Sequence, residues 1–75
     1  MRAVILVKLE PKGVVGTLES VRRIKGVTKV FFTFGRYDLI AFVEAPVLGD
    51  ICRIVLELNK LPNVTSTETL LELQP

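Results

Sequence analysis

Histidine and tryptophan are absent from this chain of 75 residues, and cysteine occurs once, at Cys52. Without histidine, a serine or cysteine nucleophile has no imidazole base beside it, so the common nucleophilic triads are excluded. One cysteine forms no internal disulfide, and without histidine it builds no Cys/His zinc cluster. We therefore expect no catalytic residue, no metal site and no cofactor.

Long apolar runs and clusters of positive charge are also missing. No apolar run approaches the roughly 20 residues of a membrane span, and the run from Ala3 to Val7 is too short for a signal sequence. Ten Lys/Arg residues stand against eight Asp/Glu, and they are spread along the chain apart from the pair Arg22-Arg23. We therefore expect a cytoplasmic protein that binds neither membranes nor nucleic acid directly.

The apolar content is high for so short a chain, with 49% hydrophobic against 24% charged residues. A domain of this size buries only about 60–65% of the surface that its unfolded chain exposes. Small domains gain further stability from disulfides, metals or partner subunits, and the first two are excluded here. The sequence therefore predicts one domain, residues 1–75, that forms homo-oligomers.

Turn residues and apolar spacing divide the chain into six elements. Strands are predicted at 2–9, 27–34, 37–44 and 64–73, and helices at 14–24 and 51–58, the second stopping before Pro62. Only a short break separates the second and third strands. The order β-α-β-β-α-β predicts an α+β fold, the ferredoxin-like sandwich, in which both helices cover one face of a four-stranded antiparallel sheet.

The sheet face without helices is also expected to be apolar. Strict alternation divides the first strand into Ala3, Ile5, Val7 and Leu9 against Arg2, Val4, Leu6 and Lys8. It divides the second into Thr28, Val30, Phe32 and Phe34 against Val27, Lys29, Phe31 and Thr33. A sheet face in contact with water would be more polar. We therefore expect the helix-free face to pack against another subunit.

The second and third strands are separated by Phe-Gly-Arg-Tyr-Asp-Leu, residues 34–39. Gly35 permits a positive φ, Asp38 offers an acceptor for an ammonium group, and turn N–H groups bind carboxylates. Thr65, Thr67 and Thr69 on the last strand add hydroxyls. An α-amino acid needs these kinds of partner. The residues alone favour a simpler alternative, a hairpin turn with Asp38 in solvent and threonines chosen for strand propensity.

Two other features have structural rather than functional interpretations. Phe31, Phe32, Phe34 and Tyr37 invite comparison with RNA-binding sheets, but the Lys/Arg-Gly-Phe signature and a basic surface are missing, so core and interface packing is favoured. Cys52 lies among Ile51, Ile54 and Val55. We therefore expect it to be a small buried hydrophobe rather than a reactive thiol.

Four segments together resemble a known family: ILVKLEP near the start, IKGVTKV after the first helix, FTFGRYDLIAFVEA, and LNKLPNVTSTETL. Over residues 2–73 the chain is similar to the effector-binding (RAM) domain of Lrp/AsnC transcription regulators. The resemblance implies a dimeric α/β barrel with sheets packed face to face, and dimers assembled into octamers or decamers. It also implies amino-acid effectors at the interface between neighbouring dimers.

The resemblance also implies roles for particular residues. The family's glycine-to-aspartate loop falls on Gly35, Arg36, Tyr37 and Asp38, with Asp38 as the partner of the ligand ammonium group. The threonine-rich strand, with its ligand-facing hydroxyls, falls on Thr65, Thr67 and Thr69.

One departure from the family pattern is the missing helix-turn-helix domain, because the chain starts at the first strand. The expectation is a stand-alone amino-acid sensor that affects transcription without binding DNA itself. The alternatives are a partner that assembles with full-length Lrp/AsnC regulators without its own ligand, or a piece of a longer protein. A small oxygenase or acylphosphatase-like enzyme is disfavoured, because histidine and a phosphate site are lacking.

Overall fold

A computed structural model describes residues 1–73 of the chain. It contains the six elements in the predicted order: β1 (Arg2–Leu9), α1 (Val14–Arg22), β2 (Val27–Phe32), β3 (Leu39–Glu44), α2 (Leu48–Asn59) and β4 (Val64–Leu71). The predicted α+β class is confirmed.

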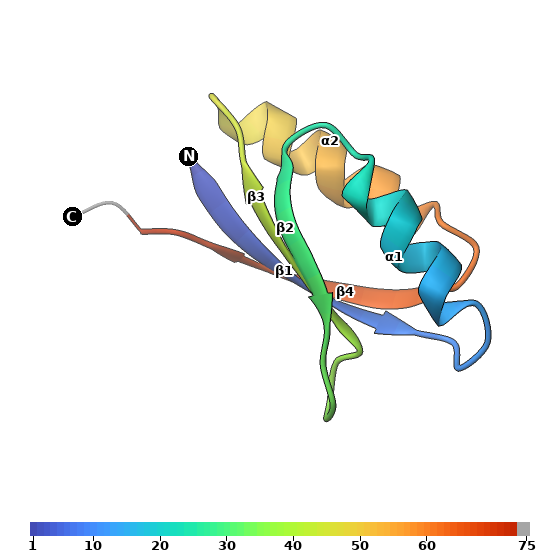
Figure 1. The fold of residues 1–75 in the computed structure, drawn as a ribbon. Coiled ribbons are helices and arrows are strands. Elements are labelled where there is room, and N and C mark those ends of the chain that lie inside the picture. Colours follow the sequence, from blue (N-terminus) through green and yellow to red (C-terminus); the bar gives the residue numbers. More distant parts are fainter. Residues whose placement is uncertain (74–75) are drawn as a thin grey trace.

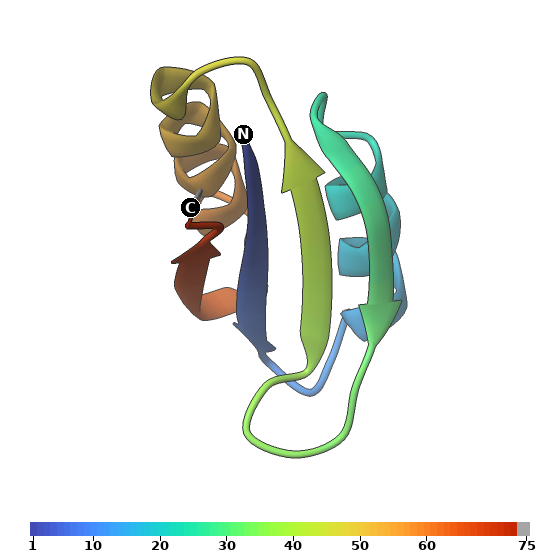
Figure 2. The same ribbon diagram turned by 90° about the vertical axis from the view of Figure 1, so that its left-hand side faces the viewer.

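The four strands form one sheet in the order β2-β3-β1-β4, and every neighbouring pair is antiparallel. Both helices lie on the same side of the sheet, and its other side is uncovered (Figure 1). In the view turned by 90°, the two central strands β1 and β3 lie between the edge strands β2 and β4 (Figure 2). This arrangement is the predicted ferredoxin-like sandwich.

The core lies between the sheet and the helices. Ile5 and Val7 of β1, Leu39 of β3, and Ile54 and Leu58 of α2 have no exposed surface. In β1 every second residue is buried, as the alternation predicts. In α2 the buried residues recur at intervals of three and four, which places them on one side of the helix.

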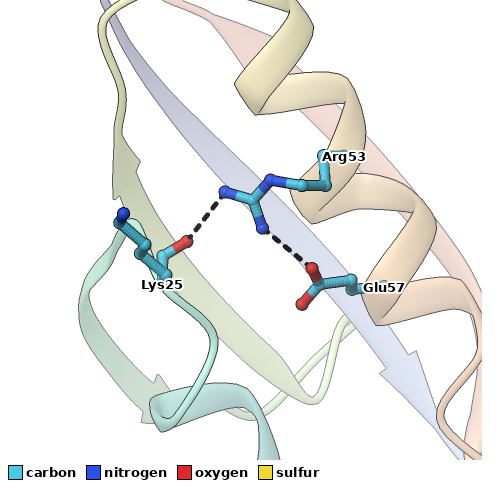
Figure 3. Close-up of polar contacts among 3 residues, drawn as sticks. All are labelled: Lys25, Arg53 and Glu57. Carbon is cyan, nitrogen blue, oxygen red and sulfur yellow. Dashed lines mark hydrogen bonds and ion pairs between the residues drawn. The ribbon is translucent and has the colours of Figure 1, made fainter.

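The turn between α1 and β2 is fixed against α2. Arg53 of α2 forms an ion pair with Glu57 (Nη1 to Oε1, 2.8 Å) and donates a hydrogen bond to the carbonyl of Lys25 (3.4 Å; Figure 3). Gly26 has a φ of 105°, and a Cβ there would lie 2.6 Å from Cδ1 of Ile54. Both the positive φ and the close packing therefore favour glycine at this position.

Several element boundaries and one register differ from the sequence prediction. α1 ends at Arg22 rather than at 24, α2 spans Leu48–Asn59 rather than 51–58, and β4 ends at Leu71 rather than at 73. β2 ends at Phe32 and β3 begins at Leu39, so the connection is longer than the predicted short break. Near Thr28 the register shifts, and Val27 pairs with Val43 while Lys29 pairs with Phe42. Strict alternation therefore assigned Val27 to the wrong face, because a bulge inserts one residue and reverses the alternation beyond it.

The prediction that Cys52 is buried is wrong, since its side chain is exposed. The buried side of α2 holds Ile51, Ile54 and Leu58. Adjacent residues on a helix are separated by about 100° of rotation, so Cys52 points away from the core although its sequence neighbours are buried. Apolar neighbours in the sequence are therefore a poor guide to burial on a helix.

Candidate functional site

The loop between β2 and β3, residues 33–38, reaches beyond the rest of the sheet in both views (Figures 1 and 2). Two hydrogen bonds close its base. The Thr33 N–H donates to the Asp38 carbonyl at 3.0 Å, and the Thr33 hydroxyl donates to the Tyr37 carbonyl at 2.7 Å. The loop is therefore an ordered hairpin end, consistent with the turn predicted from Gly35.

Asp38 joins this loop to the end of β1. Its N–H donates to the Val7 carbonyl at 2.9 Å, and its Oδ2 accepts a hydrogen bond from the Leu9 N–H at 2.8 Å. Asp38 is half-buried, so the alternative in which this carboxylate is simply in solvent is wrong. Its second oxygen, Oδ1, makes no hydrogen bond to any described residue. One carboxylate oxygen thus has a structural role and the other is available.

The three residues before Asp38 carry backbone donors that have no partner. Within residues 1–73, the N–H groups of Gly35, Arg36 and Tyr37 donate no hydrogen bond. Gly35 has a φ of 121°, and no atom lies within 4 Å of the position that a Cβ would occupy. Consecutive free N–H groups in a turn bind anions such as carboxylates. The loop therefore has three N–H groups without partners, followed in the sequence by a residue with an unpaired carboxylate oxygen.

Two side-chain contacts tie the loop to the uncovered face of the sheet. Lys8 donates from Nζ to the Arg36 carbonyl at 3.1 Å, and the Tyr37 hydroxyl donates to Oε1 of Glu68 on β4 at 2.5 Å. The hydrogen bond to the Glu68 carboxylate raises the pKa of Tyr37, because it stabilises the neutral hydroxyl. Glu68 was not among the predicted site residues, although it stands between Thr67 and Thr69.

The three predicted threonines do not contact the loop. Thr67 and Thr69 pair with Val7 and Ile5, whose side chains are buried beneath the helices, so both lie on the helix side of β4. The Thr67 hydroxyl accepts a hydrogen bond from Nδ2 of Asn59 at 3.1 Å.

Thr65 lies where the register of β1 and β4 shifts, and its hydroxyl donates to the Lys8 carbonyl at 3.1 Å. Within one chain, the contact between the loop and β4 runs through Glu68 instead.

The uncovered face of the sheet, called the free face below, is apolar at its centre. Its large apolar side chains come from all four strands: Val4, Leu6, Phe31, Ile40, Phe42 and Leu70. The rings of Phe31 and Phe42 lie 6.0 Å apart, and the Lys29 ammonium lies 5.5 Å from the Phe31 ring centre. The apolar free face expected from the sequence is present.

Three hollows of the described chain lie away from the loop. The largest, about 650 Å³, is on the free face, over Val4, Phe42 and Leu70, and the ion pair of Arg2 with Glu72 (2.8 Å) stands at its edge. None of the three is lined by residues 33–38 or 65–69. The loop therefore belongs to none of these three hollows.

Neither a metal site nor a spanning helix is found within residues 1–73. No group of three or more Asp, Glu or Cys side chains could hold a metal ion. None of the helices in that range has the length and apolarity to cross a bilayer.

Comparison with solved structures gives close matches to the whole fold. The chain superimposes on TTHA0845 from Thermus thermophilus with a TM-score of 0.93 and 27% identity, over 99% of this chain and 94% of that one. FFRP-DM1 matches with a TM-score of 0.89 and 26% identity, over 96% and 97% of the two chains.

A more distant structural match is the transcriptional regulator NMB0573 from Neisseria meningitidis, solved as a complex with L-Met. It has a TM-score of 0.83 and 20% identity, and the match covers 97% of this chain but 49% of that one. At this identity the match shows the fold alone.

A search of functionally curated proteins found no match. A family model, the Lrp/AsnC ligand binding domain, matches residues 2–75. Because this match spans nearly the full length, the chain belongs to the Lrp/AsnC ligand-binding domain family.

Proposed function

We propose that this protein is an oligomeric amino-acid sensor that acts in transcription regulation. The family supplies the general class, a regulatory ligand-binding domain. A structural neighbour in that fold is a transcriptional regulator in complex with L-Met, which supports an amino acid as the ligand.

One observation carries the choice of ligand. Within four consecutive residues the loop has three unpaired N–H groups, at Gly35, Arg36 and Tyr37, and one unpaired carboxylate oxygen on Asp38. An α-amino acid carries the complementary pair, a carboxylate and an ammonium group. In this proposal the N–H groups bind the carboxylate, and Oδ1 of Asp38 accepts from the ammonium group. Neighbouring apolar side chains would select the side chain of the ligand.

The oligomer is part of the same proposal, with the dimer built through the free face. Six large apolar side chains there would leave water when two sheets pack face to face. The three hollows of the described residues do not include the loop. In this proposal the ligand is enclosed between copies, where Thr65, Thr67 and Thr69 of a neighbouring copy supply hydroxyls.

A thermal-shift screen of the twenty amino acids tests the function. We expect at least one amino acid to raise the melting temperature of the wild-type protein, since a ligand that binds only the folded state stabilises it. The variant Asp38→Ala should lose that response. If no amino acid shifts the wild-type transition and calorimetry detects no heat of binding, the proposal fails.

A second candidate function is a partner that assembles with full-length Lrp/AsnC regulators and has no ligand of its own. It is favoured by the position of the three hollows described above, none of which includes the loop. Native mass spectrometry of this chain mixed with such a regulator separates the two. Mixed oligomers without any amino-acid response support the second function, whereas an amino-acid response without mixed oligomers supports the first.

A further inference from the structure

Lys8, near the end of β1, contacts the loop of the proposed ligand site at the peptide bond between Arg36 and Tyr37. Its Nζ donates to the Arg36 carbonyl at 3.1 Å, and no carboxylate of the described chain forms an ion pair with it. We propose that Lys8 is a positioning residue that directs the Tyr37 N–H toward the carboxylate of the ligand. The inference rests on the proposed amino-acid site and assigns it a residue from outside the loop.

The geometry of a trans peptide links the Lys8 contact to the Tyr37 N–H. Within residues 1–73 no peptide bond is cis. In a planar trans peptide the C=O and the N–H point in opposite directions. Because Lys8 binds the Arg36 carbonyl, the Tyr37 N–H points away from the Lys8 ammonium group, and it donates to no acceptor among the described residues. The contact thus fixes a donor and leaves it free for a ligand.

Tyr37 differs in this respect from the other two unpaired donors of the loop. The N–H groups of Gly35 and Arg36 belong to peptide bonds whose carbonyls, those of Phe34 and Gly35, accept no hydrogen bond from the described chain. Of the three donors, that of Tyr37 therefore has the orientation fixed by a side chain of another element. A donor that is ordered in advance binds an anion at a smaller cost in conformational freedom.

The end of β1 fixes both parts of the proposed site. The Val7 carbonyl accepts from the Asp38 N–H at 2.9 Å, and the Leu9 N–H donates to Oδ2 of Asp38 at 2.8 Å. Lys8, between them in the sequence, holds the peptide bond that carries the Tyr37 N–H. One short stretch of β1 therefore sets the proposed partner of the ammonium group and one proposed partner of the carboxylate.

The charge of Lys8 adds to this positional role. A hydrogen bond from an ammonium group is stronger than one from a neutral donor, and hydrogen bonds in series polarise one another. The bond to the Arg36 carbonyl therefore makes the Tyr37 N–H a better donor to an anion. Lys8→Arg keeps both the donor and the charge, whereas Lys8→Met, with a side chain of similar length, loses both.

Calorimetric titration with the amino acid found by the screen and with its α-amide tests this role. The amide keeps the ammonium group and the side chain but replaces the carboxylate. We expect Lys8→Met to bind the amino acid at least about tenfold more weakly than the wild type does, and to bind the amide equally well. Lys8→Arg should retain most of the affinity for the amino acid. Lys12→Met is the matched control, because Lys12 makes no hydrogen bond or ion pair within the described chain, and it should bind like the wild type.

A second measurement does not depend on an amino-acid ligand. Tyr37 is the one tyrosine of the chain, so ¹⁵N-labelled tyrosine gives a single backbone amide signal, that of the Tyr37 N–H. We expect sodium acetate to shift this signal in the wild type and in Lys8→Arg, relative to sodium chloride at the same ionic strength. Lys8→Met should need at least about tenfold more acetate for the same shift.

A folded Lys8→Met that keeps the wild-type affinity for the amino acid, or that loses affinity for the acid and the amide equally, would overturn the inference. Circular dichroism melting checks the fold of each variant, and Lys8→Gln replaces Lys8→Met if that variant does not fold. If no amino acid binds, the acetate titration decides alone. An acetate response that depends on Lys8 then leaves the positioning role standing while the sensor function fails. A Tyr37 signal that ignores acetate in the wild type, or responds equally in Lys8→Met, then overturns the positioning role as well.

Discussion

At the scale of single residues, Asp38 has an observed structural role and a proposed ligand-binding role, which sequence patterns cannot separate. The Phe-Gly-Arg-Tyr-Asp-Leu pattern correctly predicts where the hairpin turns, because a glycine between two strand-like segments allows few other structures. The bond from Leu9 to the Asp38 carboxylate joins residues 29 positions apart, so no local pattern reveals it. Glu68 was missed for the same reason, since its partner Tyr37 lies 31 positions away.

The structural role of Asp38 predicts a difference between two substitutions. Asp38→Ala leaves the Leu9 N–H without its acceptor and should lower the free energy of unfolding by about 1–3 kcal/mol. Asp38→Asn keeps a carbonyl oxygen that can accept the same bond, so most of the stability should remain. Urea unfolding of both variants measures the difference. Equal losses in the two would contradict the role of the hydrogen bond.

Tyr37 provides a pH-dependent check of the contact with Glu68. Its pKa is raised above the ordinary value of about 10 because the neutral hydroxyl donates to Glu68. The folded state therefore holds this proton more tightly than the unfolded state. The resulting stabilisation is fully present below pH 10 and is lost as the pH rises through the raised pKa.

An alkaline titration followed by phenolate absorbance measures that pKa directly, since Tyr37 is the one tyrosine and tryptophan is absent. Glu68→Gln should lower the pKa of Tyr37 relative to the wild type. Glu57→Gln, which alters a carboxylate paired with Arg53 on α2, is the control and should leave it unchanged. If the pKa of Tyr37 is the same in Glu68→Gln as in the wild type, the contact does not form in solution.

At the scale of elements, the order and type of every helix and strand could be predicted, because apolar spacing and turn residues agree along the chain. The register of β2 against β3 could not be predicted. The bulge at Thr28 depends on how β2 meets β3, and one inserted residue moved Val27 to the other face. The exposure of Cys52 likewise depends on which side of α2 packs against the sheet.

The glycines offer a test at this scale. Gly16 lies within α1 without a positive φ, and nothing lies within 4 Å of a Cβ placed there. Gly16→Ala should raise the free energy of unfolding by about 0.5–1 kcal/mol, because alanine has less backbone freedom to lose on folding. Gly26→Ala is the opposite case, with a φ of 105° and a clash with Ile54, and should destabilise. Thermal melts of both variants check the signs.

At the scale of the whole molecule, the proposed dimer and ligand site depend on surfaces between copies, which one sequence specifies only through exposed apolar residues. The apolar free face could be predicted because both faces of the strands hold large apolar residues. The projection of the β2–β3 loop beyond the sheet could not be predicted, because it depends on where the folded strands end (Figure 1). The loop of the proposed ligand site is not part of any of the three hollows found within residues 1–73.

A single charged substitution on the free face should disrupt the proposed dimer. Phe42 lies at its centre against Phe31 and is partly exposed (37%). Phe42→Lys places an ammonium group in the proposed interface, where burying an unpaired charge is costly, so the dimer should dissociate at least about tenfold more readily. Leu56→Lys on α2 is the control and should leave the dissociation constant unchanged. A wild type that is monomeric at micromolar concentration would refute the sheet-to-sheet dimer.

The central claim is that Asp38 and the free N–H groups beside it bind an amino acid, and calorimetric titration with a matched pair of ligands tests it most directly. The pair is the amino acid found by the screen and its α-hydroxy acid, which keeps the carboxylate and side chain but replaces the ammonium group. For the wild type we predict at least about tenfold weaker binding of the hydroxy acid, equivalent to about 1.4 kcal/mol. With Asp38→Asn this preference should largely vanish. Equal affinity of the wild type for the two ligands, or an unchanged preference in Asp38→Asn, would contradict the claim.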